Sequence, residues 1–141
     1  MTMHLIRTIC LCLIMLAPHG QAAIVVIVNP DNPTDNFSQR ELVDLYMGRN
    51  LYFPDGNLAV RLDQAPTSEV REAFYRALVD KSVAEVNAYW ARLLFTGRAS
   101  PPQVLDSSDK VINAVLKNRN AIGYIEEEAL VDSVKVVGRV D

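Results

Sequence analysis

Five consecutive β-branched residues, Ile24-Val25-Val26-Ile27-Val28, constrain the fold of this chain more than any other feature of its sequence. A strand with one wet face alternates apolar and polar residues, whereas an unbroken apolar run is typical of a strand covered on both faces. Asn29-Pro30 follows and ends the strand, because proline cannot donate a hydrogen bond to a neighbouring strand. The run therefore predicts a sheet flanked by helices on both sides.

Helix and strand signals alternate along the rest of the chain. Hydroxyl residues mark helix starts, because their side chains accept hydrogen bonds from the free N–H groups of the first turn. They are found at Ser38, Thr67-Ser68, Ser82 and Ser107-Ser108. Further strands are expected at 59–63, 104–105, 121–125 and 134–137. Strands and helices joined by short connections predict a single three-layer α/β domain with a mixed, mostly parallel sheet flanked by helices.

The first 22 residues have the order of a secretory signal peptide. Arg7 precedes the apolar run 8–17, and Gly20 and Ala22 are small residues at the positions that signal peptidase recognises. The run is shorter than the roughly 20 residues that span a bilayer, which disfavours the alternative of an uncleaved anchor. We therefore expect cleavage after Ala22, a periplasmic location and a single mature domain at 23–141.

Removal of this segment would exclude several kinds of chemistry. Both cysteines, Cys10 and Cys12, and both histidines, His4 and His19, lie within it. The mature chain would have no thiol nucleophile, histidine base, disulfide or zinc site built on these residues. We therefore expect no enzyme activity, no cofactor and no metal site. Without Arg7, 13 of the 14 basic residues remain beside 17 acidic residues in the count, which gives a net charge of −4. A negative net charge disfavours nucleic-acid binding.

The stretch 61–71 is the best candidate for a binding site. It joins a predicted strand to a helix start that carries two hydroxyls, Thr67 and Ser68, between Arg61 and Arg71. Free N–H groups and the helix dipole make such a start attractive to anions, and the arginines would add charge. The alternative is purely structural: Thr67 or Ser68 caps the helix, and the arginines pair with neighbouring acids such as Asp63.

Several short stretches, in the same order along residues 24–125, resemble phosphate ABC-transporter substrate-binding proteins. They are Val28-Asn29-Pro30, Glu41 to Arg49, Pro54-Asp55-Gly56, Arg71 to Tyr75, Tyr89-Trp90, Phe95-Thr96-Gly97, Pro101-Pro102 and Ala121 to Tyr124. The resemblance implies a type 2 periplasmic-binding fold. Full binding proteins of this kind close two lobes over their ligand, and this chain resembles one lobe.

The resemblance also implies a ligand, phosphate or a similar small oxyanion. In the family, an arginine and a Ser-Gly-Thr-like turn hold the phosphate oxygens; Arg61 matches the arginine, and Thr67-Ser68 falls where the turn belongs. Asp63 lies where a family acid accepts a proton from the ligand. The glycine of the turn is missing here, and a single lobe leaves an anion open to water, where hydration competes with each hydrogen bond.

Two functions therefore remain open. The first is a periplasmic solute-binding-like protein, in which a homodimer or a membrane protein supplies the missing wall of the site. The alternative is a ligand-free periplasmic interaction or sensor-accessory module that keeps the fold.

Overall fold

The computed structural model describes residues 23–141, so the predicted signal peptide lies outside the described residues. The elements are Ile24–Val28 (β1), Gln39–Tyr46 (α1), Val60–Gln64 (β2), Glu69–Val79 (α2), Val83–Phe95 (α3), Gln103–Leu105 (β3), Ser108–Lys117 (α4), Ala121–Glu126 (β4), the 3₁₀ turn Glu127–Ala129 (η1) and Lys135–Val140 (β5). Within residues 23–141, none of the helices has the length and apolar character needed to cross a membrane.

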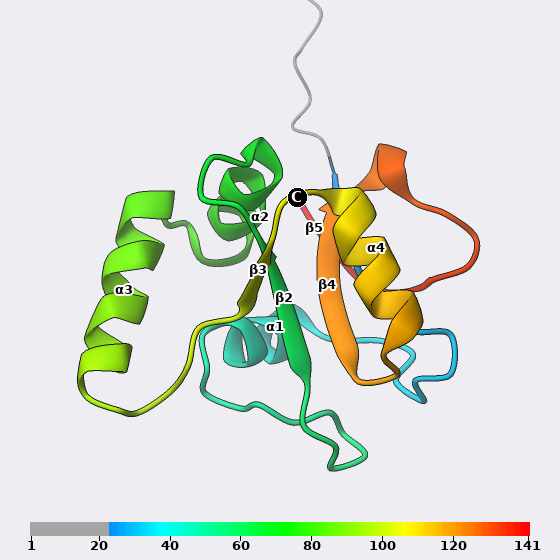
Figure 1. Ribbon diagram of the computed structural model, residues 1–141, viewed down its shortest axis with the longest axis horizontal. Helices are drawn as coiled ribbons and strands as arrows, with labels where there is room; N and C mark the ends of the chain where they lie inside the picture. Colours follow the sequence, from blue (N-terminus) through cyan, green and yellow to red (C-terminus); the bar gives the residue numbers. More distant parts are fainter. Residues whose placement is uncertain (1–22) are drawn as a thin grey trace, which may run out of the picture.

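The five strands form one mixed sheet in the order β3-β2-β4-β1-β5 (Figure 1). β2 is parallel to both β3 and β4, whereas β1 is antiparallel to its neighbours β4 and β5. Four strands therefore run in one direction and β1 runs in the other, which confirms the mixed sheet; two of the four neighbouring pairs are parallel and two are antiparallel.

β1 is buried along its whole length, as the β-branched run predicted. Its side chains alternate between two cores. Ile24, Val26 and Val28 pack with residues of α1, α2 and α3, whereas Val25 and Ile27 pack with residues of α4. The domain therefore has the three layers expected from the sequence.

The helix starts predicted at Ser38 and Ser82 form, and in each the serine and the glutamate three residues later satisfy each other's backbone N–H groups as a capping box. Gly123 in β4 permits the close approach of α4, because a β-carbon at this position would lie 2.4 Å from Cγ1 of Val111. The layers are thus held by direct packing of helix against strand.

The parallel strands place the candidate site at one edge of the sheet. The carboxyl ends of β2, β3 and β4 meet at this edge, since these strands run in the same direction. The N-termini of α2 and α4, capped by Ser68 and Ser107, follow directly from β2 and β3. Ligands of open α/β sheets bind beyond this edge.

Candidate functional site

The turn before α2 is closed by Ser68, which is the N-cap of the helix. Its Oγ accepts a hydrogen bond from the backbone N–H of Arg71 at 3.2 Å and donates one to Oε1 of Gln64 at 3.0 Å. Thr67 is exposed at the surface of the turn. The structural alternative for Ser68 is thus realised, and Thr67 offers its hydroxyl to solvent.

Arg61 lies in β2 and is 8 % exposed. Its Nη1 donates to the carbonyl of Leu45 at 3.3 Å, and its Nη2 donates to the carbonyl of Ser100 at 2.7 Å. The guanidinium also lies 5.5 Å from the centre of the Trp90 ring. Burial lowers the pKa of Arg61, although the guanidinium remains a cation. Arg61 therefore ties α1, α3 and the loop before β3 to the sheet.

Arg71 is 4 % exposed and pairs with Asp63, which is 2 % exposed. Nε of Arg71 lies 3.3 Å from Oδ1 and 3.4 Å from Oδ2 of Asp63. Nη2 donates to Oδ1 of Asn87 in α3 at 3.0 Å, and the guanidinium lies 5.2 Å from the centre of the Tyr75 ring. Nη1 is buried and has no hydrogen-bond partner among residues 23–141.

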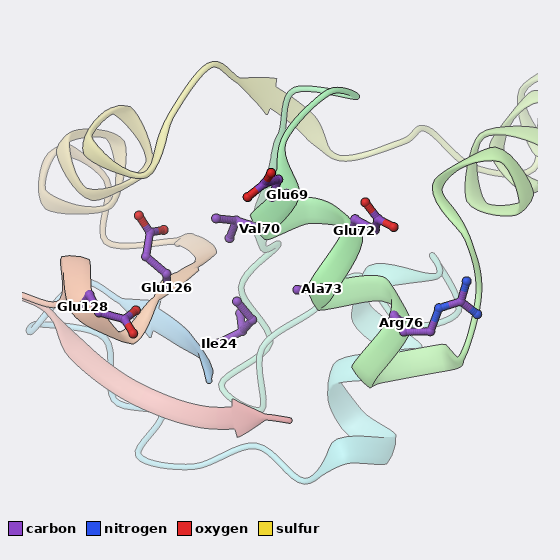
Figure 2. A pocket seen from close by; sticks show the side chains of 8 residues that line it. All are labelled: Ile24, Glu69, Val70, Glu72, Ala73, Arg76, Glu126 and Glu128. Atoms are coloured by element: carbon purple, nitrogen blue, oxygen red, sulfur yellow. The ribbon is translucent and has the colours of Figure 1, made fainter. Parts of the chain in front are cut away.

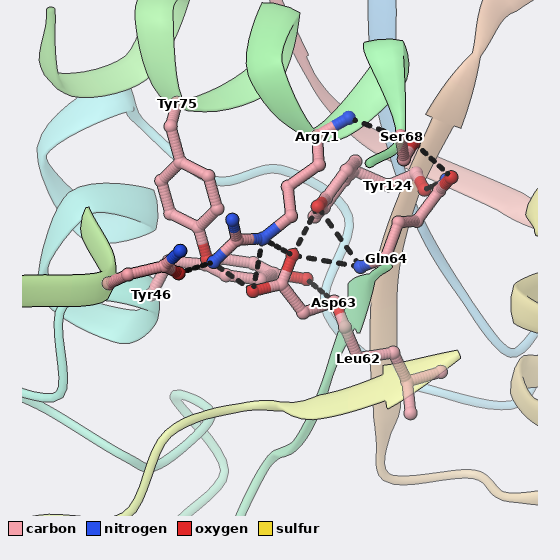
Figure 3. A network of polar contacts seen from close by, with 9 residues as sticks. Tyr46, Leu62, Asp63, Gln64, Ser68, Arg71, Tyr75 and Tyr124 are labelled. Atoms are coloured by element: carbon pink, nitrogen blue, oxygen red, sulfur yellow. Dashed lines mark hydrogen bonds and ion pairs between the residues drawn. The ribbon is translucent and has the colours of Figure 1, made fainter. Parts of the chain in front are cut away.

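Asp63 is the centre of a buried polar network (Figure 3). Tyr75 donates its hydroxyl to Oδ2 at 2.8 Å, Tyr124 donates a short hydrogen bond to Oδ1, and the backbone N–H of Gln64 donates to Oδ1 at 2.8 Å. Burial is the main cause that raises the pKa of both tyrosines well above the ordinary value, and the negative charge of Asp63 is the second. The hydroxyls therefore remain protonated donors, and the carboxylate receives donors from β2, α2 and β4.

Gln64 extends this network to α4. Its Nε2 donates to Oγ of Ser108 and to the carbonyl of Tyr124, each at 3.1 Å, while Ser108 donates a short hydrogen bond to the carboxylate of Glu126. Asp63 and Glu126 thus place two carboxylates of the chain itself beside the starts of α2 and α4, where an external anion would otherwise be favoured.

A cavity of about 670 Å³ opens beside the start of α2 (Figure 2). It is lined by Ile24, Glu69, Val70, Glu72, Ala73, Arg76, Glu126 and Glu128. Two of the carboxylates and the guanidinium come from α2, and the other two carboxylates come from the end of β4 and from η1. The surrounding charge is therefore negative, which disfavours a phosphate in this cavity.

Only three of the four residues predicted to hold a ligand lie near the carboxyl edge: Arg61 is the second residue of β2, pairs with Ile122 near the start of β4, and donates to Ser100, which precedes β3. Arg61 and Arg71 are bonded inside the domain, Ser68 caps α2, and Thr67 is exposed. Whether they hold a ligand stays a prediction. The local sequence patterns predict no polar role for Tyr75 and Tyr124, which the structure places at the carboxylate of Asp63. Buried tyrosines usually pair their hydroxyls, and this was the available signal.

Solved structures share this fold. A protein of Clostridium perfringens assigned to the phosphate ABC transporter substrate-binding proteins, with bound phosphate, has a TM-score of 0.66 and 24 % identity, over 83 % of this chain and 45 % of that one. An ABC-type phosphate transport receptor of Vibrio cholerae has a TM-score of 0.66, 19 % identity and coverage of 83 % and 46 %. PstS of Borrelia burgdorferi has a TM-score of 0.63 and 14 % identity, over 83 % of this chain and 47 % of that one.

These matches confirm the expected fold, and the chain spans about half the length of the solved structures that it matches. It therefore has the fold of one lobe of a periplasmic binding protein. Protein-family models and curated proteins gave no match to the chain.

Replacement of Asp63 by asparagine is expected to destabilise the domain strongly. Asp63→Asn leaves the buried guanidinium of Arg71 without its counter-charge, so the free energy of unfolding should fall by about 3 kcal/mol or more. Urea unfolding followed by circular dichroism measures the change. Asp132→Asn, at an exposed site, is the control and should change stability by less than about 0.5 kcal/mol. Equal stability of the two variants would contradict the central role of Asp63.

The buried tyrosines predict a loss of stability at high pH. Burial raises the pKa of Tyr46, Tyr75 and Tyr124 in the folded state, whereas an unfolded phenol titrates near about 10. The unfolded state therefore releases protons that the native state keeps, and the stabilisation that is complete below about pH 10 decreases above it. Phenolate absorbance should rise in a cooperative step together with the loss of circular dichroism. Smooth ionisation of all five tyrosines in a folded protein would refute this.

Proposed function

We propose that this chain is a one-lobe, binding-protein-like module of the periplasm that acts through contacts with other proteins, and that it does not hold a small anion tightly. One observation carries the proposal: both arginines expected at the ligand are buried and bonded to acceptors of the domain itself. The fold of a solute-binding lobe is kept, while the charge that would recognise an oxyanion is already used.

The energetics of Arg71 support this interpretation. Because Arg71 is 4 % exposed, an anion in solvent does not reach its Nη1, which is unpaired among residues 23–141, and a guanidinium that moved out to solvent would leave Asp63 unpaired in the interior. Separating a buried ion pair costs about 3–5 kcal/mol, because it leaves an uncompensated charge in the interior. A loss of that size lowers affinity by a factor of about 100 or more.

The cavity beside the start of α2 adds to the same effect. Glu69 and Glu126 line the cavity next to the start of α2, so a phosphate there meets like charge. A single lobe also leaves a bound anion hydrated, and each hydrogen bond then contributes only a small net free energy.

A second candidate is recognition of phosphate or a similar oxyanion at Arg61, Thr67, Ser68 and Arg71. It is favoured by the exposed position of Thr67 at the start of an 11-residue helix and by the unpaired Nη1 of Arg71. The solved structures with the same fold include proteins named for phosphate transport. In this case a membrane protein or a second copy would supply the missing wall.

Titration with anions distinguishes the two candidates. We expect no saturable heat in calorimetry with phosphate or sulfate. An anion whose Kd is no lower than the concentration used would add at most about 0.4 kcal/mol to the free energy of unfolding. Thr67→Val tests the turn, and Thr96→Val, at the exposed end of α3, is the matched control. Saturable phosphate binding that Thr67→Val weakens and Thr96→Val leaves unchanged would establish the second candidate, particularly if no protein partner is recovered from envelope extract.

Export is tested on the protein isolated from cells. We expect the periplasmic fraction to contain a chain that begins Ala23-Ile24-Val25, as determined by N-terminal sequencing. Ala22→Leu should block cleavage, because signal peptidase accepts only small residues at this position. A full-length chain in the cytoplasm of unmodified cells would exclude the periplasmic assignment.

A further inference from the structure

α3 presents an apolar face to solvent. Ala84, Ala88, Ala91 and Phe95 follow one another at helical spacing and are all exposed. Phe95 is 94 % exposed, and Leu94 beside it is 53 % exposed. We call these five residues the outer face of α3.

The opposite side of the same helix is also apolar. Val86 and Trp90 are buried in the core on the inner side. Figure 1 shows α3 at one end of the molecule, apart from the sheet. A helix that is apolar on both sides is typical of one covered on both sides, and exposed apolar clusters mark interaction surfaces.

The charges beside the outer face are self-complementary. Glu85 and Arg92 are seven residues apart, so they lie on the same flank of the helix, one near each end. Two copies of α3 packed antiparallel about a two-fold axis between Ala88 and Ala91 bring Glu85 to within about 3 Å, along the helix axis, of the level of the partner's Arg92. The symmetry makes this ion pair twice, at the two ends of the interface.

The sizes of the apolar residues match in the same arrangement. With the two-fold axis between Ala88 and Ala91, the exposed ring of Phe95 lies over the partner's Ala84. Ala88 then lies opposite the partner's Ala91, which allows the helices to approach closely. Large residues at the ends and small ones at the centre thus fit one another in both directions.

We propose that the outer face of α3 is a dimer interface, in which two copies of this chain pair their α3 helices antiparallel. The inference goes beyond the proposed function, since the dimer needs no anion at the turn before α2. A helix of 13 residues is about 20 Å long. It buries less than the roughly 800 Å² per partner of a standard interface, so the dimer is weak and depends on concentration.

Sedimentation velocity over a series of concentrations tests the interface. The unmodified protein is expected to shift from monomer to dimer as its concentration rises. Phe95→Asp should raise the dissociation constant at least about tenfold, because it places a charge at the buried end of the interface. Leu116→Asp is the matched control: it also changes an exposed apolar residue at the end of a helix, on the other side of the sheet, and should leave the dissociation constant unchanged.

Cysteine cross-linking tests the antiparallel direction, in a chain carrying Cys10→Ser and Cys12→Ser. Two copies of Ala88→Cys should form a disulfide, because the two positions are only about 4–5 Å apart along the helix axis. Ala84→Cys is the control and should not cross-link, since its two copies are about 16 Å apart along the axis.

Three results would overturn the proposal. The first is a monomer at every concentration, which would leave the outer face to a different protein. The second is an equal effect of Phe95→Asp and Leu116→Asp on the dissociation constant. The third is cross-linking through Ala84→Cys. The last result would indicate parallel helices. Phosphate titration of the Phe95→Asp variant tests anion binding in a chain whose dimer interface is weakened. Its result therefore bears on the proposed function and not on the dimer.

Discussion

The carboxylate of Asp63 is the interaction on which the rest of this domain depends. It lies at the end of β2 and receives donors from the backbone of its own strand, from Arg71 and Tyr75 in α2 and from Tyr124 in β4. A buried charge is tolerated only when it is paired and its lone pairs accept hydrogen bonds, and Asp63 meets both conditions. The start of α2 is consequently fixed to two strands, and Arg71 carries the connection on to α3 through Asn87.

In this domain, the residue types that would recognise an external oxyanion bind a carboxylate of the chain itself. A guanidinium, phenolic hydroxyls and a backbone N–H converge on Asp63, and Ser108 donates to Glu126 beside the start of α4. An internal carboxylate has a large advantage over a dissolved ligand, because its position costs no translational entropy. The presence of anion-binding groups at the carboxyl edge of a sheet is therefore insufficient evidence for a ligand. Whether such groups can bind a ligand depends on whether the protein itself already supplies the acceptors to which they donate.

Local patterns allowed most of the fold to be predicted, whereas the site depends on contacts between distant segments. The apolar run of β1 determined its burial on both faces, and serine capping identified the helix starts, because both signals lie within a few residues. Ser68 was correctly considered as a cap for the same reason. In contrast, Tyr124 lies 61 residues from Asp63, and Arg61 donates to the carbonyl of Ser100, 39 residues away. No spacing rule predicts such pairs, since they depend on the order of the strands in the sheet.

Asn87 connects the buried network to the surface through which we propose that the protein makes contacts. It is exposed on α3, adjacent to the outer face, and accepts a hydrogen bond from Arg71. A protein packed over α3 would remove water from this bond, and a hydrogen bond to a cation is stronger in a less polar environment. Arg71 would then be held more firmly in the interior, away from any anion at the turn. In a two-lobed binding protein the second lobe closes over the ligand. In this lobe, by contrast, a partner on α3 would oppose ligand binding, so protein contact and anion recognition would compete for the same guanidinium.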